Sequence, residues 1–299
     1  MSDTLLASTI TDPTKRHDFV FLFDVTNGNP NGDPDADNTP RFDPETRHGL
    51  VTDVCIKRKV RDYLHQMEDA NIFIQSDLSL NARIEEQVDK IRKSGGKVEK
   101  KKGKSFPFNP NLQEGMNHAY LDIRLFGAVL STGDYNAGQV RGPLQLTFSR
   151  SVDPILPLSV TITRQARTTD KRTETGTTEI GRKAIVPYAL YRGTGFFSPH
   201  LAEAVGLSRD DLGLFWLAMS RMFDYDRSAA RGEMVLREAY VFTHDNPRGN
   251  APAHKLLDLV RPSKVGAPRE YSEYAPIEIE EANLLSGVTL TKLTDVAWG

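Results

Sequence analysis

The chain has 299 residues, of which 38% are apolar and 26% charged, and its formal net charge is −2. These values are ordinary for a soluble globular protein of one elaborated domain or two. No apolar run approaches the roughly 20 residues of a membrane span or resembles a signal peptide. The single cysteine excludes an internal disulfide and a cysteine-based zinc site. We therefore expect a cytoplasmic protein without membrane contact.

The small net charge hides a segregation of charge along the chain. Residues 92–104 carry seven cations against one glutamate, and residues 270–281 carry five glutamates. For nucleic-acid binding the distribution of charge matters more than its sum. A chain with one basic and one acidic face can also stack head to tail on further copies of itself.

The clearest pattern begins with the apolar run Phe19–Phe23, which is short enough to predict a strand buried on both faces. Glycine, asparagine and proline in residues 24–33 then predict a loop with exposed backbone N–H groups. A helix is predicted from about Thr52 to Met67, with Thr52 or Asp53 as its N-cap. Its apolar spacing, expected to face the core, comprises Val54, Ile56, Val60 and Leu64.

Two cations of this helix, Lys57 and Arg61, are one turn apart and are predicted to project from the same side. A buried strand that directs a flexible loop and a cationic helix to one place can hold a phosphate chain. The sequence therefore predicts a phosphate-binding site here.

The rest of the chain predicts alternating strands and helices around two long insertions. Residues 68–118 lose clear periodicity, contain a possible helix at 80–92, and are interpreted as an insertion that reaches away from the core. For their lysine-rich part a solvated charge run is the equally weighted alternative. A threonine-rich, cationic excursion between strands at 158–162 and 184–188 predicts a protruding hairpin, which could also be an ordinary surface hairpin. Further strands are predicted at 121–130, 143–149, 233–243 and 275–279, with Leu144, Leu146 and Phe148 facing one way. Helices are predicted at 199–205, from Ser208 and at 253–260.

The order strand, helix, strand, strand, helix, strand is typical of a split βαβ fold. We therefore predict an α+β protein of the ferredoxin-like or RNA-recognition type.

Most catalytic chemistry is not favoured. The loop after Asp33 begins like a calcium loop, but Asn38 and Pro44 replace the required glycine and glutamate. Thr26 replaces the second aspartate of an aspartyl-phosphate enzyme. We expect no metal and no cofactor. Two alternatives stay open: a metal-dependent nuclease that uses Asp24 or the carboxylates of residues 33–37, and a protein-interaction module that binds no nucleic acid.

Six motifs in series resemble one protein family. They are Phe23–Asp33, Gly49–Arg61, Asp122–Gly127, Gly142–Gln145, Val186–Leu190 and His244–Lys255. Together they resemble the repeated backbone subunit of CRISPR type I Cascade complexes, the Cas-seven family, and are most similar to subtype I-C.

The resemblance implies a single elaborated domain over residues 1–299. A modified RNA-recognition palm would carry a finger-like insertion at 68–118 and a thumb β-hairpin at 158–188. The subunit would be non-catalytic and would line up with further copies of itself along a CRISPR guide RNA. It would also assemble with other Cascade subunits and recognise target DNA in antiviral defence. No base-stacking aromatic motif is evident, which predicts recognition of the RNA backbone.

The predicted contact residues follow from these two lines of reasoning together. Target DNA is expected at the lysine-rich segment, through Lys97, Lys100, Lys101, Lys102 and Lys104. Guide RNA is expected at the loop, the helix, the central strands and the thumb, through Asn27, Asn29, Asn31, Arg47, Thr52, Lys57, Arg58, Arg61, Gln139, Arg141, Gln145, Arg164, Arg167, Arg182 and Lys183.

Overall fold

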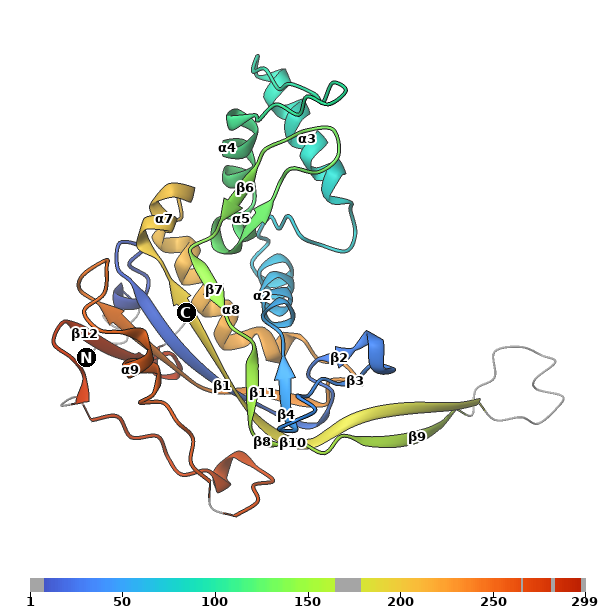
Figure 1. Cartoon of the computed structure of the whole chain (residues 1–299), viewed down its shortest axis with the longest axis vertical. Helices are drawn as coiled ribbons and strands as arrows, with labels where there is room; N and C mark the ends of the chain where they lie inside the picture. Colours follow the sequence, from blue (N-terminus) through green and yellow to red (C-terminus); the bar gives the residue numbers. More distant parts are fainter. Residues whose placement is uncertain (1–7, 165–178, 265, 281–282, 297–299) are drawn as a thin grey trace.

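One antiparallel sheet runs through the centre of the molecule (Figure 1). The computed structural model describes residues 8–164, 179–264, 266–280 and 283–296. The main path of the sheet runs in the order β12-β11-β1-β10-β8-β4. These strands are β12 (Val288–Lys292), β11 (Glu233–His244), β1 (His17–Gly28), β10 (Glu179–Phe197), β8 (Ser149–Pro154) and β4 (His48–Val51).

The central strand β1 is buried on both faces, as its apolar run predicted. Phe19, Phe21 and Phe23 belong to the larger core cluster, whereas Val20 and Leu22 belong to a second cluster on the opposite face. All five side chains have no exposed surface. Strand side chains alternate between the two faces of a sheet, so the apolar side chains of this run are all buried only if both faces are covered.

Helices α2 (Asp53–Met67) and α8 (Arg209–Tyr225) contribute to the larger core cluster, and α7 (Pro199–Val205) precedes α8. Thr52 caps α2 by accepting a hydrogen bond from the Cys55 N–H at 3.2 Å, and Ser208 and Asp211 form a capping box on α8. These predicted helix starts are confirmed. The prediction that Val54 faces the core is wrong, because this residue is 65% exposed. The other three predicted core residues of α2, Ile56, Val60 and Leu64, are buried.

A segment after β11, of which the structure describes residues 251–264, 266–280 and 283–287, covers the other face of the sheet. Helix α9 (Ala253–Leu257) begins this segment, which continues through the short helix η2 (Tyr271–Glu273). The strand predicted at 275–279 is wrong: Ile277 and Ile279 pack on the second core cluster without a ladder partner. The last strand of the sheet is instead β12, which pairs with β11.

A separate group of elements stands at one end of the molecule, at the top of Figure 1. It comprises α3 (Leu80–Lys93), α4 (Pro110–Ala119), α5 (Leu121–Phe126), β5 (Gly127–Val129) and β6 (Gln139–Arg141). The strand predicted at 121–130 is therefore wrong over its first six residues. The alternating pattern suggested that the polar residues Asp122 and Arg124 face solvent, but both have partners within the protein. The Asp122 carboxylate accepts the Phe73 N–H, and Arg124 pairs with Asp211.

The predicted hairpin leaves the opposite side of the sheet and extends away from the body (Figure 1). Strand β9 (Leu158–Arg164) pairs with the first part of β10, from Leu158 opposite Ile185 to Arg164 opposite Glu179. β10 then continues into the sheet. The short β7 (Leu144–Leu146) also pairs with β10, but Phe148 does not share its buried face and is 56% exposed. The remaining short elements are β2 (Gly32–Asp33), β3 (Thr39–Pro40), η1 (Pro34–Ala36) and η4 (Leu293–Asp295).

Candidate nucleic-acid interface

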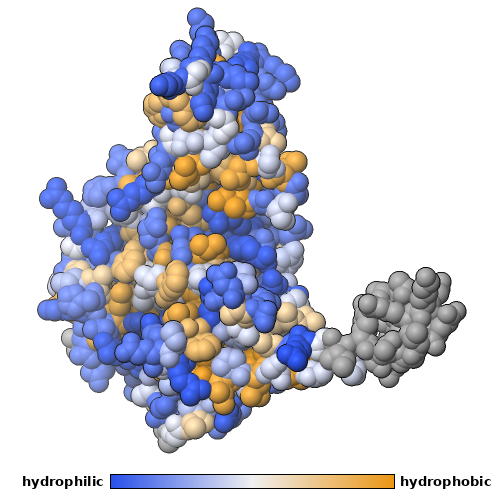
Figure 2. All heavy atoms as spheres, turned by 45° about the vertical axis from the view of Figure 1, so that its right-hand side comes forward, coloured by the Kyte–Doolittle hydropathy of each residue, from blue (hydrophilic) through white to orange (hydrophobic). Residues whose placement is uncertain are grey.

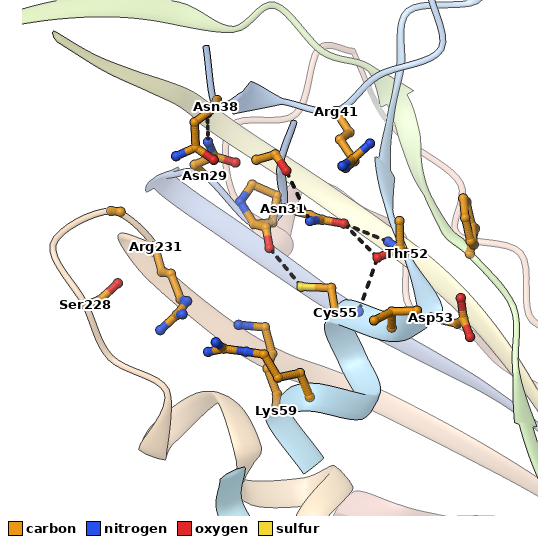
Figure 3. A pocket seen from close by; sticks show the side chains of 16 residues that line it. Asn29, Asn31, Asn38, Arg41, Thr52, Asp53, Cys55, Lys59, Ser228 and Arg231 are labelled. Carbon is orange, nitrogen blue, oxygen red and sulfur yellow. Dashed lines mark hydrogen bonds between the residues drawn. The ribbon is translucent and has the colours of Figure 1, made fainter. Parts of the chain in front are cut away.

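A hollow of about 620 Å³ opens at the N-terminus of α2 (Figure 3). Its walls come from the loop after β1, the β2–β3 turn, the first turns of α2 and the loop before β11, with Phe148 at one side. Segments far apart in the sequence therefore meet where the polar loop and the basic helix were predicted to meet. We call this space the α2 hollow.

Side-chain hydrogen bonds hold the polar loop against the helix. The Asn31 Oδ1 atom accepts the Thr52 N–H at 2.9 Å and the Thr52 hydroxyl at 3.0 Å. The Asn29 amide donates to the Asn38 carbonyl at 2.6 Å, and the Cys55 thiol lies 3.5 Å from the Pro30 carbonyl (Figure 3). The loop thus has a fixed course over its asparagines, although its composition predicted flexibility.

Close backbone packing brings the loop before β11 to the same place. The Asn29 N–H donates to the Ala230 carbonyl at 2.8 Å. A Cβ atom at Gly28 would lie 1.8 Å from the Arg231 carbonyl oxygen, so only glycine permits this approach. Gly232 has a φ of 61°, and a Cβ atom there would lie 2.4 Å from the Thr26 carbonyl oxygen. These contacts place the Arg231 side chain in the hollow.

Cations predominate in the walls of the α2 hollow. Arg41, Arg58, Lys59 and Arg231 line it, against the single carboxylate of Asp53. Helix N-termini carry partial positive charge and free N–H groups, which adds to the attraction for an anion. The arrangement can hold a phosphate in a hydrogen-bonding environment.

The wall cations differ in how available they are. Lys59 is 2% exposed and contacts the buried Asp226 carboxylate, so its charge is neutralised within the fold. Arg231 also contacts Asp226, with 27% of its side chain exposed. Arg58 pairs with Asp62 at 3.2 Å and is 56% exposed, and Arg41 lies 3.3 Å from the Asp33 carboxylate. Arg41, Arg58 and Arg231 are therefore the cations that a ligand can reach.

Of the helix cations predicted to bind phosphate, only Arg58 lines the hollow. Lys57 pairs with Asp53 at 2.9 Å and lies 5.7 Å from the ring centre of Phe126. Arg61 is the main correction. It is buried, and its Nε donates to the Asp122 carboxylate at 2.8 Å. Its guanidinium therefore neutralises a buried carboxylate and does not face the hollow.

The other predicted contact residues are dispersed. Asn29, Asn31 and Thr52 line the hollow with Arg58, but the rest do not. Gln139 and Arg141 are exposed on β6, and the Gln145 amide donates to the Gly142 carbonyl at 3.0 Å. Asn27 is exposed near the end of β1, and Arg47 is exposed in the loop before β4. On the hairpin, Arg182 is exposed, Lys183 donates to the Ala229 carbonyl and Arg164 ends β9, while Arg167 lies outside the described residues. The five lysines Lys97, Lys100, Lys101, Lys102 and Lys104 are exposed between α3 and α4.

Sequence reasoning missed Arg41, Arg231 and Phe148 as parts of this site. Arg231 reaches it only through the pairing of β1 with β11 and the glycine contacts, which no local pattern predicts. Arg41 follows the β2–β3 turn, whose course depends on the asparagine hydrogen bonds. Phe148 was predicted to share a face with Leu144 and Leu146, but it lies in the short link between β7 and β8.

The carboxylates of the nuclease alternative do not converge. The Asp24 carboxylate accepts hydrogen bonds from Arg237 at 2.8 Å and from the Tyr188 hydroxyl at 3.2 Å. Burial raises the pKa of Asp24, and these hydrogen bonds oppose the shift. Asp33 faces Arg41 and accepts the Asp35 N–H. Within the described ranges, no three His, Cys, Asp or Glu side chains are grouped so as to hold a metal ion.

None of the helices in the described part of the chain is long and apolar enough to cross a membrane.

Comparison with known proteins gives a family match over most of the chain. The family described as CRISPR-associated protein Cas7 matches residues 15–280. A CRISPR-associated protein Cas7 of Haloferax volcanii is 33% identical over 116 residues, which cover 39% of this chain and only 32% of that relative.

Two solved structures are also similar. One, titled CRISPR RNA-guided surveillance complex, pre-nicking, is 12% identical with a TM-score of 0.48, covering 76% of this chain and 78% of that one. The other, titled CRISPR RNA-guided surveillance complex, is 13% identical with a TM-score of 0.44, covering 76% and 68%.

Proposed function

The chain belongs to the CRISPR-associated Cas7 family, and from that premise we propose that it is a non-catalytic subunit that binds a CRISPR guide RNA through the RNA backbone. One observation carries the proposal: Arg41, Arg58 and Arg231 meet at the N-terminus of α2 around an open hollow. Phosphate contacts of this kind position a strand without reading its sequence, as a guide of any sequence requires.

The topology of the sheet supports an RNA-recognition type of palm. The inner strands follow the order β11-β1-β10-β8, with α2 after β1 and α8 after β10, which is the arrangement of a split βαβ unit. Ordinary RNA-recognition modules stack bases on the open face of such a sheet. Here residues 251–264 and 266–280 cover much of that face. This supports RNA contact at the end of α2 instead.

The hairpin β9–β10 would act as the thumb and the α3–α4 group as the fingers. The hairpin supplies Arg182, and Lys183 joins it to the loop that carries Arg231 through the Ala229 carbonyl. The exposed lysines between α3 and α4 would contact the backbone of target DNA. Further copies of the subunit would assemble along the guide, together with other subunits of a type I-C Cascade complex.

The test is the nucleic-acid content and size of the purified protein before and after ribonuclease treatment. We expect large, RNA-containing assemblies that collapse on digestion. A monomer free of RNA that also fails to bind added single-stranded RNA at low salt would contradict the proposal. Cleavage of added RNA or DNA in magnesium or manganese would return the nuclease alternative to first place.

A further inference from the structure

A second basic hollow, of about 330 Å³, lies at the edge strand β4. Its charged walls are His48, Arg150, Arg192, Arg261 and Asp258. Arg192 donates to the carbonyls of Leu257, the last residue of α9, and of Val260 just after it. This hollow therefore lies on the sheet face away from α2 and α8. We call it the β4 hollow.

Two of its arginines occupy an unfavourable place in the sheet. Arg150 of β8 and Arg192 of β10 stand directly opposite each other on neighbouring antiparallel strands. Like charges in this relationship destabilise a sheet. Burial, and then repulsion from Arg261, lower the pKa of Arg192. A third guanidinium therefore adds to the same local positive charge.

Carboxylates balance this charge only in part. Arg150 pairs with Asp43 at 2.9 Å and Arg261 with Asp258 at 2.7 Å. Arg192 donates to backbone carbonyls at 2.8 and 2.6 Å, and within the described ranges it forms no ion pair. His48 stands beside them, its ring held by an Nδ1–H donated to the Ser151 carbonyl at 2.7 Å. An anion bound in the hollow would reduce the repulsion between the arginines and accept several hydrogen bonds.

We propose that the β4 hollow binds a backbone phosphate of the same nucleic-acid strand that the α2 hollow holds, an inference that rests on the proposed function. The two hollows lie at the two ends of β4, with His48 in one and Thr52 in the other. Four residues of strand span about 13 Å, which a few nucleotides of single strand can cover. The guanidinium fork suits phosphate, and the placement of two basic hollows at the two ends of one strand favours a nucleic acid over an acidic protein segment.

The test uses the double variant Arg150→Gln/Arg261→Gln. Both side chains are largely exposed, at 51% and 71%. Removing two of the mutually repelling charges should leave the unfolding temperature of the free protein unchanged or higher. The matched control is Arg209→Gln/Arg248→Gln, two arginines outside both hollows. Two probes are applied to each protein: tripolyphosphate in thermal unfolding, and a single-stranded RNA of arbitrary sequence titrated over a range of salt.

Tripolyphosphate should raise the unfolding temperature of the parent and control proteins more than that of the double variant. The slope of log affinity for RNA against log salt should be smaller for the double variant by roughly 1.4, at about 0.7 per lost contact. An unchanged slope in a variant whose parent binds RNA would overturn this inference alone. A parent protein that binds no RNA would overturn the proposed function as well. Binding of polyglutamate in place of RNA, abolished in the double variant, would reassign the hollow to an acidic protein partner.

Discussion

Asn31 accepts two hydrogen bonds from Thr52 through one side-chain oxygen, from the backbone N–H at 2.9 Å and from the hydroxyl at 3.0 Å. Thr52 in turn caps α2 through its Oγ1. A single amide thereby joins the loop after the central strand to the first turn of the basic helix. The phosphate-binding geometry we propose depends on this junction, because it fixes the loop and Arg58 relative to each other.

Replacing Asn31 by alanine should loosen that junction. Two hydrogen bonds are lost, so we expect a decrease of about 1 to 2 kcal/mol in the free energy of unfolding. RNA affinity should fall roughly tenfold, the equivalent of about 1.4 kcal/mol. Urea unfolding and filter binding measure the two effects. Asn111→Ala, at an exposed position of α4, should change neither. Normal affinity in the Asn31 variant would show that RNA does not depend on this loop.

Arg58 and Arg61 lie on adjacent turns of α2, but we expect Arg58 to bind RNA and Arg61 to stabilise the fold. Arg61→Met leaves the Asp122 carboxylate buried without its cation, so unfolding should become easier by about 3 to 5 kcal/mol. Arg58→Gln removes an exposed pair and should cost less than about 1 kcal/mol.

Only Arg58→Gln should weaken RNA binding in proteins that are still folded. Denaturant melts and RNA titrations on both variants separate these roles. A stable Arg61→Met protein with impaired RNA binding would restore the phosphate-contact role that the sequence predicted for Arg61.

Replacing the lysines between α3 and α4 should weaken DNA binding without weakening RNA binding. In Lys101→Gln/Lys102→Gln/Lys104→Gln, the salt slope of duplex DNA binding should decrease by roughly 0.9 per lysine that contacts a phosphate. Guide RNA binding should be preserved, because these exposed residues lie outside the α2 hollow. Equal losses for the two ligands would contradict their assignment to target DNA.

Stability should depend on pH through His17. Burial lowers its pKa from 6.5 to about 4, and the neutral ring donates to the Asp12 carbonyl while accepting from Thr243. Between these pKa values the unfolded chain binds the extra proton, so stability falls as pH falls from 6.5 towards 4. The expected loss between pH 8 and pH 5 is about 2 kcal/mol. Urea unfolding at both values should show a weaker pH dependence in His17→Gln, and an equal dependence would exclude His17 as its source.

The sequence predicted those features that depend on neighbouring residues. The buried β1, the Thr52 cap and the Ser208–Asp211 capping box all follow from patterns a few residues long. The direction of Arg61 could not be predicted in this way, because its partner Asp122 lies on α5, which the alternating pattern indicated as a strand. Arg231 likewise enters the site only through the register of β1 with β11 and the close approach at Gly28.

The exposed cations of the α2 hollow give the most direct test of the account. Arg41→Gln/Arg58→Gln should be compared with the parent protein for single-stranded RNA affinity over a range of salt, after both proteins are shown to unfold alike. We predict weaker binding for every RNA sequence and a salt slope smaller by roughly 1.4, for two lost contacts at about 0.7 each. Identical affinities and slopes would contradict the claim that this hollow holds the RNA backbone.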